Sequence, residues 1–439
     1  MKILSAFLLL LVFLLVIRGE TLNAKEQYND FITKNNIRVI GKELKTNEII
    51  AFDMFFKGGS SLLNSSNAGI EALTLNVLLE GSKEYPKQKL YEELIPMGTE
   101  ITSRNNYDYS VISMKCLKKY FEKSLLILAS LLKDPLFEEK EIKNAKEAML
   151  AEIKRDLDNP SKYIWQLVNN SLFKDHPYRN YPNGLLNTIP QLERGDLMNW
   201  HKKMFDTSRI LMTYAGDLEQ NVLKQYLEKH FDFFHKGDYK ETEVPDYSRQ
   251  TQINFEQREI PSSHVICKFQ CPNMKDDDYP ALSLTLALLS QNLKQRVRTD
   301  EGLAYSIYSN ASIYRTNFAS IYFSSPKPDE VLKLVRDEIN KLKNEFLPEK
   351  FIKDNVNLFY TYHFLSQQSN SGLAASMGIH QILSKGYNYD FVIMEKVKKV
   401  TASDIKNVAN KYLKGFHIGI ISPLKDIKDA EIFKEFIQI

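Results

Sequence analysis

The feature that most constrains the fold is an internal repeat, because the chain runs through one order of predicted elements twice. Each time a strand-like alternation precedes an apolar helix, at residues 47–59 and 69–81 and again at residues 262–272 and 279–289. A second strand pair, long amphipathic helices and a closing strand complete both copies. The copies lie roughly 200 residues apart, too far for a solenoid repeat. This grouping predicts an α+β fold with two homologous domains rather than one doubly wound sheet.

The two copies set the predicted domain boundaries. The N-terminal domain is predicted to span residues 25–235 and the C-terminal domain residues 251–439. Between them, residues 236–250 are rich in charge, contain Pro245 and have almost no apolar periodicity. Such a composition is typical of a linker.

The first 24 residues differ from the rest of the chain. Lys2 precedes an apolar run at residues 3–17, and the small residue Ala24 follows. This pattern predicts a secretory signal peptide over residues 1–24 and hence an exported, periplasmic protein. The run is short for a membrane span, which needs about 20 apolar residues. An uncleaved membrane anchor formed by residues 3–17 is the alternative.

The charge argues against nucleic-acid binding, and the cysteine content argues against a fold held by several disulfides. The net charge is +3 with acids and bases mixed along the chain, so no basic surface for nucleic acid is expected. The three cysteines are Cys116, Cys267 and Cys271, fewer than a disulfide-stapled exported protein normally carries. Cys267 and Cys271 lie on one face of a predicted strand, where we interpret them as small buried residues. A disulfide or a shared metal remains the alternative, and their redox state stays open.

Six motifs occur in order along the chain. They are FKGGSSLLNSSNAGIEALTLNVLLEGSKEYP, AEIKRDLDNP, HPYRNYPNG, YAGDL, DDDYPAL and VRTDEGLAYSIYS. The ordered set resembles the pitrilysin/insulinase family of metallopeptidases, including subunits like those of the mitochondrial processing peptidase. The resemblance covers nearly everything after the leader. It implies two homologous metallopeptidase-like domains, each an antiparallel sheet with helices packed on one face.

Active members of this family carry an H-x-x-E-H motif on a helix. Two histidines at i and i+4 share one helical face and bind Zn²⁺, while the glutamate activates the metal-bound water. The resemblance places Ala72 and Asn76 at the histidine positions and Leu75 at the glutamate position, and it matches a later zinc-ligating glutamate to Glu152. Alanine and leucine offer no lone pair, and asparagine is a poor ligand for zinc. The resemblance therefore implies no metal in this chain and zinc only on a partner subunit.

The histidines do not predict a different zinc site. None precedes His176, so a shift of register cannot restore the motif. His230 and His235 are five residues apart, which does not place them together on a helix. Glu152 is then predicted to be a solvated or hydrogen-bonded carboxylate. The remaining histidines are expected to be isolated surface or core residues: His176, His201, His264, His363, His380 and His417.

The second half contains the segment QRVRTDEGLAYSIYS, which carries the remaining candidate chemistry. The resemblance implies that Arg298 and Tyr305 hold the substrate backbone opposite a zinc ion. An arginine fork can bind a peptide carbonyl, and a tyrosine hydroxyl can stabilise the oxyanion as it forms. Residue chemistry alone favours a structural role instead, with the arginine paired to Asp300 or Glu301 and the tyrosine packed in the sheet.

These features predict a non-catalytic subunit of an exported heterodimeric zinc metalloprotease that degrades or processes peptides. A homologous H-x-x-E-H partner would hold the zinc, and extended peptide would add to a sheet edge. Thr102 and Ser103 stand where catalytic members usually have an Asn-Ala pair, which fits loss of catalysis in the first half. The alternatives are a peptide-binding or scaffold protein without a proteolytic role, and an autonomous peptidase with another metal arrangement.

Overall fold

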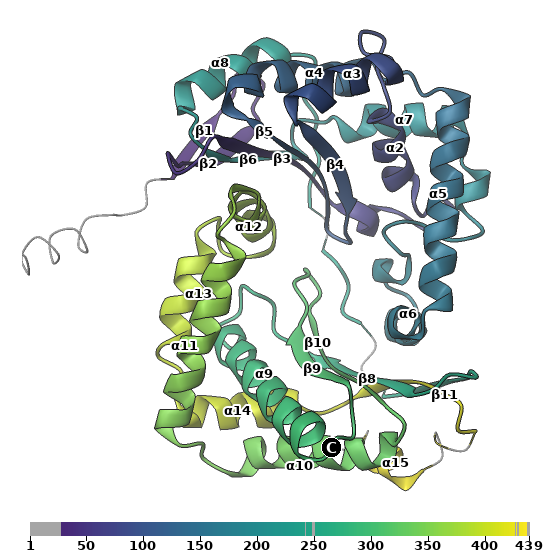
Figure 1. Cartoon of the computed structure of the whole chain (residues 1–439), viewed down its shortest axis with the longest axis vertical. Coiled ribbons are helices and arrows are strands. Elements are labelled where there is room, and N and C mark those ends of the chain that lie inside the picture. Colours follow the sequence, from purple (N-terminus) through teal and green to yellow (C-terminus); the bar gives the residue numbers. More distant parts are fainter. Residues whose placement is uncertain (1–27, 242, 248–250, 426, 428–429, 437–439) are drawn as a thin grey trace, which may run out of the picture.

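The computed structural model describes residues 28–439 except 242, 248–250, 426, 428–429 and 437–439. The predicted signal peptide or anchor therefore lies outside the described residues. The chain forms two layered halves, one above the other in Figure 1. Among the helices of the described residues, none has both the length and the apolar character that crossing a membrane requires.

The first half contains a six-stranded sheet in the order β1-β2-β6-β3-β5-β4. Only β2 and β6 run parallel to each other, and all other neighbours are antiparallel. Its strands are β1 (Asn29–Ile32), β2 (Arg38–Glu43), β3 (Ile49–Lys57), β4 (Glu100–Asn105), β5 (Tyr109–Leu117) and β6 (Ile210–Gly216). Its helices are α2 (Ile70–Leu78), α3 (Lys87–Met97), α4 (Phe121–Lys133), α5 (Glu139–Asp158), α6 (Pro160–Leu172), α7 (Arg194–Met204) and α8 (Gln220–His230).

The second half contains a five-stranded sheet in the order β7-β11-β8-β10-β9. Its strands are β7 (Ile253–Gln257), β8 (Ser263–Gln270), β9 (Ser306–Ala311), β10 (Phe318–Ser325) and β11 (His417–Ser422). Its helices are α9 (Tyr279–Leu293), α10 (Pro328–Asn344), α11 (Glu349–Ser366), α12 (Asn370–Leu383), α13 (Tyr389–Val397), α14 (Ala402–Tyr412) and α15 (Glu431–Phe436).

The two sheets share one topology. The order β2-β6-β3-β5-β4 in the first half matches β7-β11-β8-β10-β9 in the second, and the parallel pair takes the same place in both, β2 with β6 and β7 with β11. Strand β1 is the addition in the first half. The internal repeat and the α+β class predicted from the sequence are thereby confirmed.

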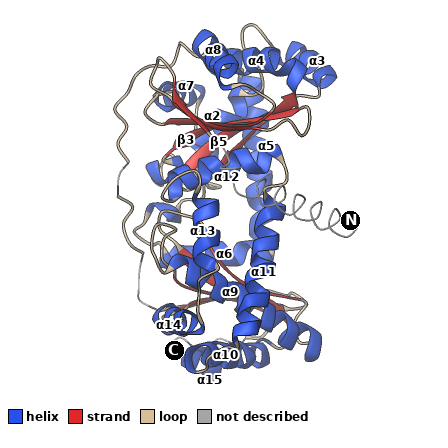
Figure 2. Cartoon of the chain, turned by 90° about the vertical axis from the view of Figure 1, so that its left-hand side faces the viewer, coloured by secondary structure: helices blue, strands red, loops and turns tan. Residues whose placement is uncertain are grey.

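One helix of each half packs on the sheet of the other half. Helix α12 packs on β3 and β6 of the first sheet, and α6 packs on β8 and β11 of the second (Figure 1). Glycines allow both approaches: a Cβ at Gly378 would lie 2.1 Å from the Phe55 ring, and one at Gly419 would lie 2.4 Å from Val168. Helices α11 and α13 run lengthwise between the sheets (Figure 2). They precede and follow α12 in the chain and so position it against the first sheet.

The sequence of strand β3 reflects the packing of helices on both faces of its sheet. Every residue from Ile50 to Phe56 is buried, because helices cover both faces of the sheet. A strand buried on both faces is expected to be continuously apolar rather than alternating. Asp53 is the exception, and burial raises the pKa of its carboxyl to about 6.

An aromatic cluster joins the halves where the β4–β5 and β9–β10 hairpins meet. The rings of Tyr107 and Tyr178 stack with centroids 4.4 Å apart, and the Tyr314 ring lies 5.3 Å from Tyr107. Asp108 accepts hydrogen bonds from the Tyr178 hydroxyl at 2.5 Å and from the Arg315 amide at 2.9 Å. The halves are therefore held together by specific contacts in addition to the exchanged helices.

His176 at this junction makes folding stability depend on pH. Its Nδ1 accepts a hydrogen bond from the Tyr178 amide at 3.0 Å, and its Nε2 lies 3.3 Å from the Thr316 hydroxyl. Burial lowers its pKa to about 4. Below pH 6.5 the unfolded chain therefore binds a proton that the folded chain does not bind until about pH 4. The free energy of unfolding thus decreases as the pH is lowered through this window.

The variant His176→Asn keeps a side-chain acceptor for the Tyr178 amide but removes the titrating ring. We expect the wild type to lose about 2 kcal/mol more unfolding free energy than this variant between pH 7.5 and 4.5. Urea unfolding at both pH values measures the difference. The exposed control His235→Asn should behave as the wild type does, and an identical pH response of His176→Asn would contradict the assignment.

Candidate functional site

Helix α2 holds the positions that the sequence resemblance matches to the zinc motif. Ala72 and Leu75 are completely buried in the core of the first half. Asn76 is half-buried, and its side-chain oxygen accepts a hydrogen bond from the Ser103 hydroxyl on β4 at 3.0 Å. Of these three side chains, only that of Asn76 is polar and partly exposed, whereas those of Ala72 and Leu75 pack in the core.

A cavity of about 610 Å³ lies between α2, α3, α5 and the edge strand β4. Asn76, Thr102, Ser103 and Glu152 line it. The structure thus brings Asn76 and the exposed Glu152 to one cavity, while Ala72 and Leu75 stay in the core.

The residues at this site do not fit zinc. Glu152 supplies the one carboxylate of the four positions, and the Asn76 oxygen is already hydrogen-bonded. Within the described part of the chain, no group of three or more His, Cys, Asp or Glu side chains could hold a metal ion. Structural and catalytic zinc sites use at least three protein ligands, so these four positions do not provide a zinc site.

Three charged side chains, which pair with one another, also line this cavity. Lys87 lies 2.6 Å from Glu80 and 2.5 Å from Glu141. Hydrogen bonds to these two carboxylates raise the pKa of Lys87, and the bond from Lys87 lowers the pKa of Glu141. The three side chains tie α3 to α5 and offer no free nucleophile or base.

A buried ion pair on α2 was not predicted from the sequence. The Arg209 guanidinium lies 3.0 Å from Glu71, with side-chain exposures of 5% and 2%. Trp200 Nε1 donates to the same carboxylate oxygen at 3.2 Å, and Arg209 Nε donates to the Lys57 carbonyl at 2.9 Å. The pair anchors the first turn of α2 to α7 and to the sheet. Glu71 is the only charged residue of helix α2, and this was the signal that could have revealed the pair.

Arg298 and Tyr305 lie on the connection from α9 to β9. The π-helical turn Lys294–Asp300 continues α9, and Gly302, with φ 63°, turns the chain into the strand. The Arg298 guanidinium lies 5.2 Å from the centre of the Tyr305 ring, and Tyr305 is 84% exposed.

The surroundings of the pair leave it open to solvent. The neighbouring Arg296 bonds to Glu338 at 2.8 Å and to Asp337 at 3.2 Å, which fixes the turn. Arg298, in contrast, forms no ion pair with any carboxylate among the described residues, including Asp300. The pair does not line the cavity of Asn76 and Glu152.

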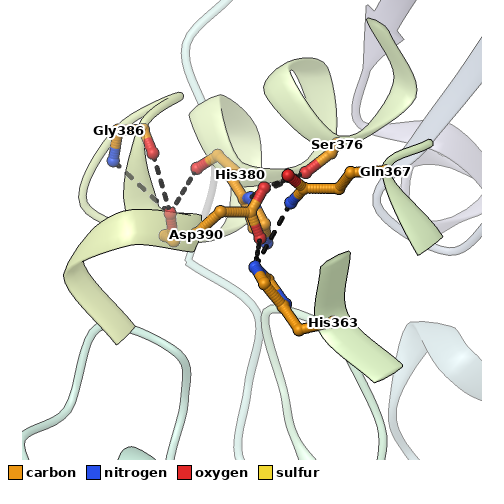
Figure 3. A network of polar contacts seen from close by, with 7 residues as sticks. His363, Gln367, Ser376, His380, Gly386 and Asp390 are labelled. Carbon is orange, nitrogen blue, oxygen red and sulfur yellow. Dashed lines mark hydrogen bonds and ion pairs between the residues drawn. The ribbon is translucent and has the colours of Figure 1, made fainter. Parts of the chain in front are cut away.

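A polar network between α11, α12 and α13 corrects the expectation that His363 and His380 are isolated (Figure 3). His363 Nε2 lies 3.2 Å from one oxygen of Asp390, and His380 Nδ1 lies 3.1 Å from the other. Burial alone would raise the pKa of Asp390, but hydrogen bonds from His380 and Ser376 outweigh it and lower that pKa. The expectation was wrong because the two histidines lie on different helices, whose packing their spacing does not show.

This network is not a nucleophile triad. A serine relay needs the serine on one imidazole nitrogen and the carboxylate on the other. Here Ser376 Oγ and Asp390 both face Nδ1 of His380, at 3.2 and 3.1 Å, and Ser376 also donates directly to Asp390. The cluster joins three helices and does not activate the serine.

Cys267 and Cys271 are buried, unpaired thiols in the structure, and Cys116 is also free and buried. Burial raises the pKa of the Cys267 and Cys271 thiols. These two side chains lie in the core of the second half, which supports their interpretation as small core residues.

Comparisons with known proteins cover both halves. Residues 38–184 match the family model described as insulinase (peptidase family M16), and residues 191–356 match the peptidase M16 inactive domain. An uncharacterized zinc protease of Rickettsia felis is 21% identical over 92% of this chain and 99% of its own length. The non-peptidase homolog YmxG of Helicobacter pylori is 23% identical over 77% of this chain and 84% of its own.

Two further similarities concern a complex subunit and a solved structure. Subunit 1 of the bovine cytochrome b-c1 complex is 22% identical over 58% of this chain and 54% of its own length. The crystal structure of a peptidase M16 inactive domain from Pseudomonas fluorescens matches with a TM-score of 0.82 at 21% identity, covering 91% of this chain and 98% of that one. At that identity the likeness shows the fold alone. Because both halves match, the chain belongs to the insulinase (M16) family.

Proposed function

We propose that this chain is the non-catalytic, substrate-holding subunit of an exported heterodimeric zinc metalloprotease that degrades or processes peptides. The observation that carries the proposal is the exposed contact between Arg298 and Tyr305 in a chain whose own α2 helix contains no histidine. The zinc would lie on a homologous partner with an H-x-x-E-H helix.

The pair has the chemistry that such a role needs. An arginine fork can donate two hydrogen bonds to a peptide carbonyl. A tyrosine hydroxyl aimed at the developing oxyanion stabilises the transition state. Because Arg298 has no carboxylate partner among the described residues and Tyr305 is largely exposed, both groups can be offered to another subunit without breaking contacts in this one.

The first half offers a place for extended peptide. Strand β4 is the last strand of its sheet, so one side of its backbone has no strand neighbour. An extended chain can add to such an edge through main-chain hydrogen bonds. The cavity of Asn76 and Glu152 lies beside this edge and can take side chains of the bound peptide.

The second candidate is a scaffold or peptide-binding protein of the same fold with no proteolytic role. The similarity to subunit 1 of the bovine cytochrome b-c1 complex favours it. The two candidates differ in one property: only the first requires that Arg298 and Tyr305 change the activity of a zinc-bearing partner.

The test mixes the purified chain with an H-x-x-E-H family member from the same cell and follows cleavage of a quenched fluorescent peptide. Alone, the chain should bind no stoichiometric zinc and cleave nothing. The mixture should cleave the peptide, and the double variant Arg298→Ala with Tyr305→Phe should lower that rate roughly a hundredfold.

The matched control is Tyr362→Phe, which removes a hydroxyl from an exposed tyrosine on α11. It should leave the rate of the mixture unchanged. Full activity of the double variant would refute the role of the pair, and a partner that cleaves equally well without this chain would favour the scaffold.

Export is part of the same proposal. A signal peptide over residues 1–24 would release the mature chain into the periplasm, whereas residues 3–17 would hold it at the membrane if uncleaved. Intact mass of the protein isolated from its native cell distinguishes these outcomes. A soluble chain that still carries residues 1–24 would contradict both.

A further inference from the structure

A second cavity lies between the two halves, at the end of strand β4. Its volume is about 430 Å³. Its walls come from the β4–β5 hairpin, α6 and strands β8, β9 and β10, so both halves contribute to it. The hairpins that meet here point toward each other in Figure 1.

Lys268 is the charged side chain of this cavity. It lies on β8 and is completely buried. Its Nζ donates a hydrogen bond to Asn169 Oδ1 at 2.5 Å and lies 4.3 Å from the Phe318 ring and 4.8 Å from the Trp165 ring. No carboxylate forms an ion pair with Lys268 in the part of the chain that the structure describes.

A buried ammonium without a counterion is costly. Burial accordingly lowers the pKa of Lys268 far below its ordinary value. An anionic group in the cavity would stabilise the protonated form of Lys268, and the described protein supplies no carboxylate partner for it.

The rest of the lining suits a carboxylate. No aspartate or glutamate lines this cavity, so nothing repels an anion. Asn105, Asn169 and Asn310 contribute side-chain amides, which can donate hydrogen bonds to carboxylate oxygens. A protonated lysine with amide donors and aromatic walls can bind one carboxylate and the apolar group beside it.

The position of the cavity connects it with peptide. Asn105, the last residue of β4, lines this cavity and also a neighbouring one of about 340 Å³ that contains Glu152. Glu152 in turn lines the cavity of Asn76. The three cavities therefore follow the β4 edge from α2 to Lys268.

We infer that the cavity of Lys268 binds the C-terminal carboxylate of a peptide that lies along β4. This rests on the proposed peptide-holding function and makes it specific: the subunit reads the end of its substrate. Lys268 forms the ion pair with the carboxylate, and the amides of Asn105 and Asn310 complete its hydrogen bonds. The aromatic rings cover the last side chain.

The test uses the full chain and two pools of fluorescein-labelled decapeptides, identical except that one ends in free carboxylates and the other in amides. Fluorescence anisotropy should show at least about tenfold tighter binding of the free-acid pool, as expected for a hydrogen-bonded charge. Lys268→Met should abolish this difference.

The control Lys275→Met changes an exposed lysine and should preserve the difference. Should Lys268→Met fail to fold, the comparison of the two pools on the wild-type chain still decides. Equal binding of both pools would overturn the inference and leave the peptide-holding function standing. Absence of binding by either pool would overturn both, whereas the Arg298 and Tyr305 experiment tests the protease role separately.

Discussion

Replacing Glu71 by glutamine is expected to lower the free energy of unfolding by about 3–5 kcal/mol, because it leaves the buried Arg209 guanidinium without its counterion. The Arg209 side chain is 5% exposed, so water cannot take the place of the carboxylate. Glutamine has nearly the same size as glutamate and can still accept from Trp200. The loss therefore reports the missing charge rather than a cavity.

Urea unfolding of the isolated chain measures this effect. The control Glu147→Gln changes an exposed carboxylate on α5 whose nearest lysine nitrogen is 3.9 Å away. Exposed pairs of this kind contribute about 0–1 kcal/mol, so the control should stay near the wild type. Equal stability of the two variants would show that Arg209 is not dependent on Glu71.

The pair can also be removed as a unit. Apolar replacement of both members of a buried ion pair is often far less harmful than removal of one. We therefore expect Glu71→Leu with Arg209→Met to be more stable than either single change. A double variant with the summed loss of both would indicate that the hydrogen bonds to Trp200 and Lys57, rather than the charges, hold the first turn of α2.

The sequence allowed the fold to be predicted where the information is local or repeated. Strand alternation, apolar helices and their repeated order predicted two homologous α+β halves, and the matching strand orders of the two sheets confirm it. The exchange of α6 and α12 could not be predicted. It depends on Gly378 meeting Phe55 and Gly419 meeting Val168, and a glycine in a sequence does not say which distant chain approaches it.

The candidate site divides in the same way. Arg298 and Tyr305 are seven residues apart with Gly302 between them, so the turn that brings them together is local. The pairs Glu71 with Arg209 and His363 with Asp390 join separate segments of the chain, and only tertiary packing brings them together. Lys268 was missed because a strand lysine is usually exposed, and its burial depends on α6 from the other half.

The last prediction concerns what α2 has become. In a zinc-bearing relative the position of Leu75 would hold the glutamate that activates water, yet here Leu75 is completely buried in an apolar core. Leu75→Glu should therefore cost about 4–5 kcal/mol, since it removes core packing and buries a carboxylate with no partner. Added zinc should not restore the loss, because Ala72 provides no ligand beside it.

Two controls on the same helix separate charge from shape. Leu75→Met conserves volume and should cost less than about 1.5 kcal/mol. Asn76→His introduces an imidazole at the half-buried position that faces the cavity, and it should be tolerated because there is room and solvent for the ring. Thermal and urea unfolding with and without equimolar zinc measure all three. If the Leu75→Glu chain were as stable as Leu75→Met, position 75 would be open to solvent, as in a catalytic helix. The helix would then have lost only its zinc ligands and would not have become a packing element of the core.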